Sequence, residues 1–184
     1  MTVMAVMPRA AHEWTVDDLA RLPDDGLQYE LLDGILLVSP APVPVHQVVA
    51  GNVYLALRTA CPEGLRALFA PLDWQPDQRT SLQPDLLVVG RDDLGEKNIT
   101  EPLLLAVEVL SPSTRRKDAV LKFSKYAECG VASYWLVDPA VPSVVAYDLL
   151  DGAYTEVARG EAGEQVALHQ PLDVTLTPDR LVTD

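Results

Sequence analysis

Apolar residues recur along the chain with two periods, and each period predicts its own elements. Helical spacing of the apolar positions predicts a long helix over 45–60, which Pro62 and Gly64 follow. A second helix is expected over 115–129, closed by Gly130. A short helix should begin after Thr15, whose hydroxyl is suited to an N-cap.

Shorter apolar runs predict strands, and two Asp-Gly pairs predict hairpins. The single strands are expected over 65–75, 86–89, 103–110 and 133–137. Asp33-Gly34 should join strands 28–32 and 35–39, and Asp151-Gly152 should join strands 143–149 and 153–158. The run from Leu103 is the most apolar, which is typical of a central strand covered on both faces.

The order of these elements predicts an α/β fold with a mixed sheet. The succession of strand, helix and strand across 103–137 favours a right-handed crossover. Residues 1–14 are expected to form a flexible leader, and 15–184 a single domain.

Composition narrows the class of protein. The 184 residues are 48% hydrophobic and 22% charged, typical of a soluble globular chain. A formal charge of −13 argues against a protein that coats nucleic acid non-specifically, although it leaves room for a local basic site. The longest aliphatic run, Leu103 to Val107, is too short for a bilayer, and no signal peptide is evident. Cys61 and Cys129 lie far apart, so we expect a reduced, cytoplasmic protein.

The strongest candidate for chemistry is Glu108, because it interrupts an otherwise aliphatic strand. A charge there is costly unless it is neutralised, so Glu108 is either a functional carboxylate or the partner of a structural base. Strand alternation places it on one face with Leu104, Ala106 and Leu110.

Asp85 is the natural partner of Glu108. Of four Pro-Asp pairs, only Pro84-Asp85 leads straight into an aliphatic strand, although such an Asp could also simply cap a turn. If strands 85–89 and 103–110 are neighbours, the two carboxylates converge. With the Val109 carbonyl as a third oxygen, they suit Mg²⁺ or Mn²⁺ better than Zn²⁺.

A basic cluster follows the Glu108 strand. Five of the 14 basic residues fall within eleven positions: Arg115, Arg116, Lys117, Lys122 and Lys125. They are either a solvated helix face or phosphate contacts with one catalytic lysine. Tyr126 shares a helix face with Lys122. Glu30 and His46 are weaker candidates for the site. Glu30 is either an exposed strand residue or an additional ligand of a metal or water. His46 is either a residue of a helix terminus or core, or a site residue near the phosphate.

Two motifs carry a family resemblance. The segments Gln83-Pro84-Asp85-Leu86-Leu87-Val88-Val89 and Glu108-Val109-Leu110-Ser111-Pro112-Ser113-Thr114 resemble the core motifs of the Uma-two family, restriction-endonuclease-like proteins of the PD-(D/E)xK nuclease superfamily. Tyr29 to Gly34, Ser39 to Gln47, Lys122 with Tyr126, and Tyr134 to Pro139 agree with the same family, so the resemblance covers residues 15–180.

The resemblance implies a restriction-endonuclease-like core, a central mixed sheet flanked by helices and decorated by the two hairpins. It also implies Mg-dependent hydrolysis of phosphodiester bonds, with DNA as the expected substrate and Asp85, Glu108 and Lys122 as the catalytic set. The superfamily lysine would fall at Leu110, and the resemblance places it on the following helix at Lys122. Arg115, Arg116, Lys117 and Lys125 would contact nucleic acid, and a homodimer is expected by analogy with enzymes that cut both strands.

Two alternatives stay open. Leu110 and the acidic charge also fit a catalytically silent module that binds nucleic acid or protein with the same fold. A third interpretation is a metal-dependent hydrolase of small phosphorylated compounds.

Overall fold

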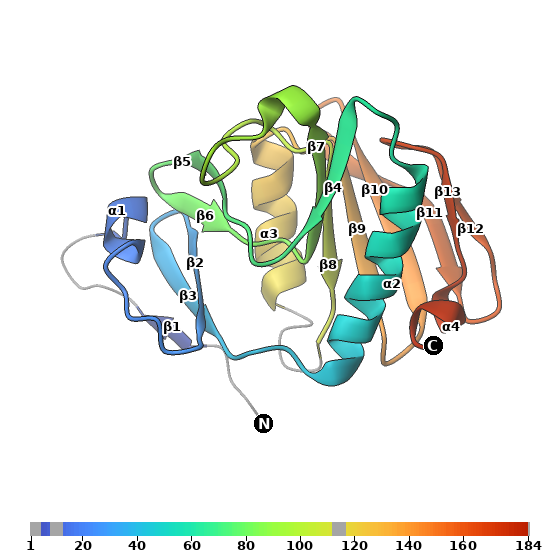
Figure 1. Ribbon diagram of the computed structural model, residues 1–184, viewed down its shortest axis with the longest axis horizontal. Helices are drawn as coiled ribbons and strands as arrows, with labels where there is room; N and C mark the ends of the chain where they lie inside the picture. Colours follow the sequence, from blue (N-terminus) through green and yellow to red (C-terminus); the bar gives the residue numbers. More distant parts are fainter. Residues whose placement is uncertain (1–4, 8–12, 112–116, 184) are drawn as a thin grey trace.

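A six-stranded mixed sheet is the centre of the computed structural model, which describes residues 5–7, 13–111 and 117–183 (Figure 1). The strand order is β11-β10-β9-β8-β7-β4, and only β8 and β9 pair in parallel. The strands are β4 (Leu65–Phe69), β7 (Leu86–Gly90), β8 (Leu105–Val109), β9 (Ser133–Asp138), β10 (Ser143–Leu150) and β11 (Ala153–Glu161). The predicted neighbours 85–89 and 103–110 are therefore adjacent, as β7 and β8.

Two helices cover opposite faces of this sheet (Figure 1). Helix α2 (Pro44–Ala60) packs Val53 and Leu57 against the face that carries Val88 and Val107. Helix α3 (Lys117–Glu128) packs on the other face, where Ala106 lies. Since successive side chains of a strand point to opposite faces, the aliphatic runs of β7 and β8 are buried on both sides, as the sequence predicted.

A second sheet lies on the α3 side, with the order β1-β3-β2-β6-β5. Its strands are β1 (Ala5–Met7), β2 (Gln28–Leu32), β3 (Ile35–Ser39), β5 (Trp74–Asp77) and β6 (Thr80–Leu82). The predicted β2–β3 hairpin is confirmed, and Asp33 and Gly34 both have positive φ, as its two-residue turn requires. Within residues 1–14, which are expected to form a leader, Ala5–Met7 pairs with β3 as an edge strand. Residues 1–4 and 8–12 lie outside the described residues.

One expected strand is divided in the structure, and two other regions hold elements that the apolar pattern does not predict. The predicted strand 65–75 is two strands, because β4 ends at Phe69 and β5 joins the other sheet beyond Pro71. Residues 80–82 form β6, which the apolar pattern did not reveal. Residues 166–181, for which the apolar pattern predicts no element, form the paired strands β12 (Val166–Leu168) and β13 (Val174–Leu176) and the helix α4 (Pro178–Leu181). These elements pack onto the same side of the core as α2.

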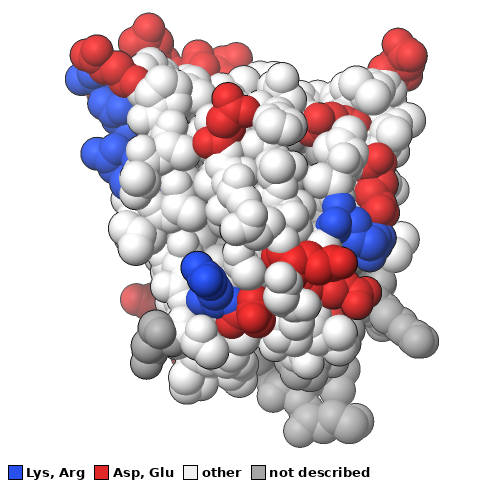
Figure 2. All heavy atoms as spheres, turned by 90° about the vertical axis from the view of Figure 1, so that its right-hand side faces the viewer, with Lys and Arg blue, Asp and Glu red and all other residues white. Residues whose placement is uncertain are grey.

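The remaining short elements are α1 (Val16–Leu19), capped by Thr15 as predicted, and a 3-10 turn, η1 (Arg91–Asp93). Figure 2 looks onto the side of β12, β13 and α4, where Asp and Glu are scattered over the face and its edges and Lys and Arg occur in a few separate groups. This side offers no continuous basic surface to a polyanion. Within the described residues, no helix combines the length and apolarity needed to cross a bilayer.

Candidate active site

The site begins where β7 and β8 run side by side. Leu86 pairs with Val107, so Asp85, just before β7, lies beside the end of β8. One oxygen of Asp85, Oδ2, accepts the backbone N–H of Val109 at 2.7 Å. The register of two neighbouring strands thus brings Asp85 to Glu108, as the sequence predicted from the two separate motifs.

Glu108 is buried on the α3 side, with 8% of its surface exposed. Lys122 donates to its Oε1 at 3.1 Å, and the Tyr126 hydroxyl donates to the same oxygen at 2.8 Å. Lys122 and Tyr126 lie one turn apart on α3 and therefore donate to the same carboxylate oxygen. Burial of the Tyr126 hydroxyl and the negative charge of Glu108 raise the pKa of Tyr126 well above its usual value.

Burial raises the pKa of Glu108 from 4.5 to about 8. The positive charge of Lys122 and the hydrogen bond from Tyr126 oppose this rise, whereas the negative charges of Asp85 and Glu30 add to it. The site therefore holds more negative charge than its one lysine neutralises.

Glu30 joins the site from the second sheet. It is 3% exposed on β2, and its Oε1 accepts both Lys122 Nζ at 2.8 Å and the backbone N–H of Gln83 at 2.8 Å. Lys122 is thus held between a carboxylate from each sheet. The structure brings Glu30 and Gln83 to the site, as the sequence suggested, and rules out the interpretation of Glu30 as an exposed strand residue.

His46, in the first turn of α2, completes the group. Its Nε2 donates to Asp85 Oδ2 at 3.1 Å, and its Nδ1 is buried without a hydrogen-bond partner among the described residues. A proton on Nε2 is the arrangement that a carboxylate acceptor requires. His46 and the Val109 N–H together fix the orientation of Asp85.

These side chains line part of a cleft of about 1060 Å³. Asp85, Glu108, Val109, Glu30, His46 and Lys122 all contribute to its wall. The half-buried carboxylate of Asp85, the buried carboxylate of Glu108 and a neighbouring backbone oxygen are oxygen donors of the kind that Mg²⁺ or Mn²⁺ prefers. The excess negative charge favours a cation there. Among the described residues no group of three or more His, Cys, Asp or Glu side chains is arranged as a metal cage, so substrate or water would complete the shell.

The basic cluster is divided by the fold. Arg115 and Arg116 lie outside the described residues, and Lys117 begins α3 with a side chain that is likewise not described. Lys122 enters the site. Lys125, expected to contact nucleic acid, instead turns to the second sheet.

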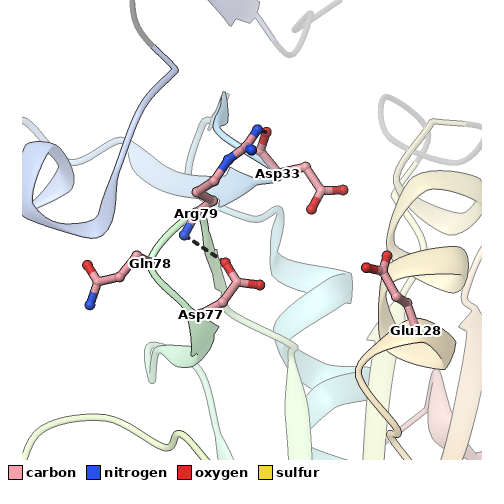
Figure 3. A pocket seen from close by; sticks show the side chains of 5 residues that line it. All are labelled: Asp33, Asp77, Gln78, Arg79 and Glu128. Carbon is pink, nitrogen blue, oxygen red and sulfur yellow. Dashed lines mark hydrogen bonds between the residues drawn. The ribbon is translucent and has the colours of Figure 1, made fainter.

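Lys125 has a structural environment of its own. Its side chain is 5% exposed, and Nζ lies 2.7 Å from Asp33, 3.5 Å from Asp77 and 3.5 Å from Glu128. Figure 3 shows these three carboxylates around a small pocket that Gln78 and Arg79 complete. Burial opposes the charge, but the hydrogen bond to Asp33 and the surrounding carboxylates raise the pKa of Lys125 above its usual value. Lys125 is therefore engaged in ion pairs away from the cleft.

Some cleft residues were missed by sequence reasoning. Gln28 and Asp73 line the cleft beside Gln83, and each is hydrogen-bonded to its side chain. They come from different segments of the second sheet and its connections, and nothing in their local sequence marks them. The pairing of β6 with both β2 and β5 brings them together.

Comparison with known proteins agrees with this architecture. One solved structure, a putative nuclease belonging to DUF820 from Anabaena variabilis ATCC 29413, matches with a TM-score of 0.64 and 19% identity, over 77% of this chain and 83% of that one. At this identity the likeness shows a shared fold, which confirms the expected mixed α/β core. No curated protein matches the chain. Residues 16–179 match Uma2, described as putative restriction endonuclease. Because this match spans most of the sequence and includes every described site residue, the chain belongs to the Uma2 family.

Proposed function

We propose that this protein is a metal-dependent endonuclease that hydrolyses phosphodiester bonds in DNA. The observation that carries the proposal is the convergence of Asp85, Glu108 and Lys122 on the wall of one cleft. The family and the nuclease fold support it independently.

The proposed metal ligands are Asp85, Glu108 and the Val109 carbonyl. A bound Mg²⁺ or Mn²⁺ would lower the pKa of a water and stabilise charge on the phosphate. The protein supplies the orientation: the Val109 N–H and His46 hold Asp85, and Tyr126 holds Glu108. Carboxylates fixed in this way need little rearrangement when a cation and a phosphate arrive.

Hydrolysis forms a bond from a water oxygen to phosphorus and breaks a bond from phosphorus to an ester oxygen, which leaves with a proton. We assign to Lys122 the stabilisation of negative charge on the phosphate. Its Nζ is 3.1 Å from Glu108, so a phosphate beside Glu108 lies within reach of the ammonium group. Glu30 is the positioning residue that keeps this lysine at the site.

The test is cleavage of supercoiled plasmid with millimolar Mg²⁺ or Mn²⁺. Lys122→Met is compared with Lys125→Met, because both lysines are buried on α3 but only Lys122 faces the cleft. We expect Asp85→Asn, Glu108→Gln and Lys122→Met to lower the rate by about 100-fold or more, and Lys125→Met to keep it.

Two results would refute the proposal. One is equal cleavage by the parent and the carboxylate variants, which would exclude this site. The other is a folded parent that cleaves no DNA and is not stabilised by either ion, which would indicate a catalytically silent module.

A further inference from the structure

The cleft extends well beyond the carboxylate site. Its lining also includes residues of α1, of the segment leading into β2, and the prolines before α2 and after β4, and the apolar residues among them include Leu19, Leu22 and Leu27. A volume of about 1060 Å³ is that of a pocket that encloses a ligand of nucleotide size or somewhat larger. A duplex, by contrast, is far too wide to enter it and would lie across its mouth.

The described lining of the cleft carries too few cationic side chains to bind a nucleic-acid backbone along several phosphates. Among the described residues that line it, six are acidic (Asp17, Asp24, Glu30, Asp73, Asp85 and Glu108) and only Lys97 and Lys122 are basic. Binding along several phosphates requires several cationic side chains. One phosphate can be held, at the carboxylate end with its cation and Lys122, and the rest of the cleft suits an uncharged group.

The polar groups beside the site are arranged in a chain. Gln28 Nε2 donates to Gln83 Oε1 at 3.1 Å, and Gln83 Nε2 donates to Asp73 Oδ1 at 2.7 Å. Because a carboxylate can only accept, Asp73 fixes the orientation of both amides. The described residues provide no hydrogen bond to Gln28 Oε1 or Asp73 Oδ2, and each amide keeps a second N–H.

The cleft therefore presents fixed donors and acceptors beside an apolar wall, next to the place proposed for a phosphate. The edge of an unpaired nucleobase presents the complementary pattern, and side-chain amides are the groups that commonly bind it. Tyr29 also lines the cleft and supplies an aromatic ring.

We propose that this chain of amides, with the apolar wall, binds an unpaired nucleobase, so that the substrate is single-stranded or locally unpaired DNA. This inference rests on the proposed function for the chemistry at the phosphate, but the base subsite is defined by its own residues.

Two measurements test it. The first compares cleavage of single-stranded DNA with cleavage of the same sequence as a perfect duplex and as a duplex with an unpaired bubble. The second measures binding of uncharged nucleosides by NMR titration without metal, so that neither phosphate nor cation contributes. Gln28→Ala is the test variant, and Gln78→Ala, an amide in the small pocket of Figure 3, is its matched control.

We expect the single strand and the bubble to be cleaved in preference to the duplex. Gln28→Ala should raise the KM for single-stranded DNA by about 5-fold and weaken nucleoside binding by a similar factor, because such a change corresponds to the roughly 1 kcal/mol that one hydrogen bond contributes. Gln78→Ala should change neither. Equal cleavage of duplex and single strand, or no nucleoside binding by the parent, would overturn the inference while leaving the nuclease proposal intact. Nucleoside binding without any cleavage would leave the subsite in place and refute the proposed function.

Discussion

Replacing Glu108 by Gln should stabilise the metal-free protein, and more so as the pH rises. The substitution keeps the shape of a side chain that is 8% exposed and removes its charge. Lys122 retains Glu30 as a partner at 2.8 Å, so no buried cation is left alone. What disappears is the cost of ionising a carboxyl group among Asp85, Glu30 and an apolar strand.

The direction of this pH dependence follows from the pKa of Glu108, which is about 8 in the folded protein and ordinarily 4.5. Between these values the folded state holds the proton and the unfolded state has lost it, so the free energy of unfolding falls as the pH rises. One pKa unit corresponds to about 1.4 kcal/mol, so the decrease attributable to Glu108 is about 3 kcal/mol by pH 7 and about 5 kcal/mol above pH 8.

The assay is urea denaturation in EDTA at several values between pH 5 and pH 9, for the parent, Glu108→Gln and Glu128→Gln. Glu128 is also on α3, but its side chain is 67% exposed. As the pH rises, the free energy of unfolding of the parent should fall relative to that of Glu108→Gln. The values for the parent and for Glu128→Gln should fall by the same amount. A difference between the parent and Glu108→Gln that is the same at pH 5 and pH 8 would refute the argument that Glu108 is buried as an acid.

Three further predictions concern the metal, the hydrogen bond to Glu108 and the core. Mg²⁺ or Mn²⁺ should raise the Tm of the parent more at pH 8 than at pH 6, because metal binding requires ionised Glu108, and a rise that persists in Glu108→Gln would contradict this site. Tyr126→Phe removes a hydrogen bond that lowers the pKa of Glu108, so the loss of stability in the urea series should begin at the same pH but continue to a higher pH than in the parent. A loss that ends at the same pH in both proteins would contradict an effect of this hydrogen bond on Glu108. Leu57→Ala removes a buried side chain between α2 and the sheet and should lower the free energy of unfolding, measured by urea denaturation, by about 2–5 kcal/mol. Leu55, on the same helix, is 65% exposed, so Leu55→Ala should lower it by less than about 1 kcal/mol. Similar losses in the two variants would contradict the packing of this face of α2 against the sheet.

Local chemistry explains what could be predicted from the sequence. The Asp-Gly turns were predictable because few residue pairs adopt two successive positive φ values. The position of Glu108 was predictable because a charge within an aliphatic strand needs a partner, and β7 and β8 are indeed neighbours.

Long-range pairing explains what could not be predicted. Lys122 and Lys125 both lie on α3, and nothing in the sequence of that helix shows that one meets Glu108 and the other Asp33 and Asp77. Asp33 and Asp77 come from the second sheet, and its short strand β6 shows no periodic pattern of apolar residues. The strands of the tail are three residues each, too short for a periodic pattern.

The ion pairs of Lys122 have a consequence for how the protein folds. Glu30 belongs to the smaller sheet and Glu108 to the larger, and the lysine between them comes from a third segment of the chain. Contacts of this sequence separation form late, after the loops between them have closed. Lys122 is therefore positioned between its two carboxylates only when the two sheets have docked, so a chain that lacks the β2–β3 hairpin cannot assemble this cluster. The proposed cleavage would thus be confined to the completed fold, and a chain that is still being synthesised would lack it.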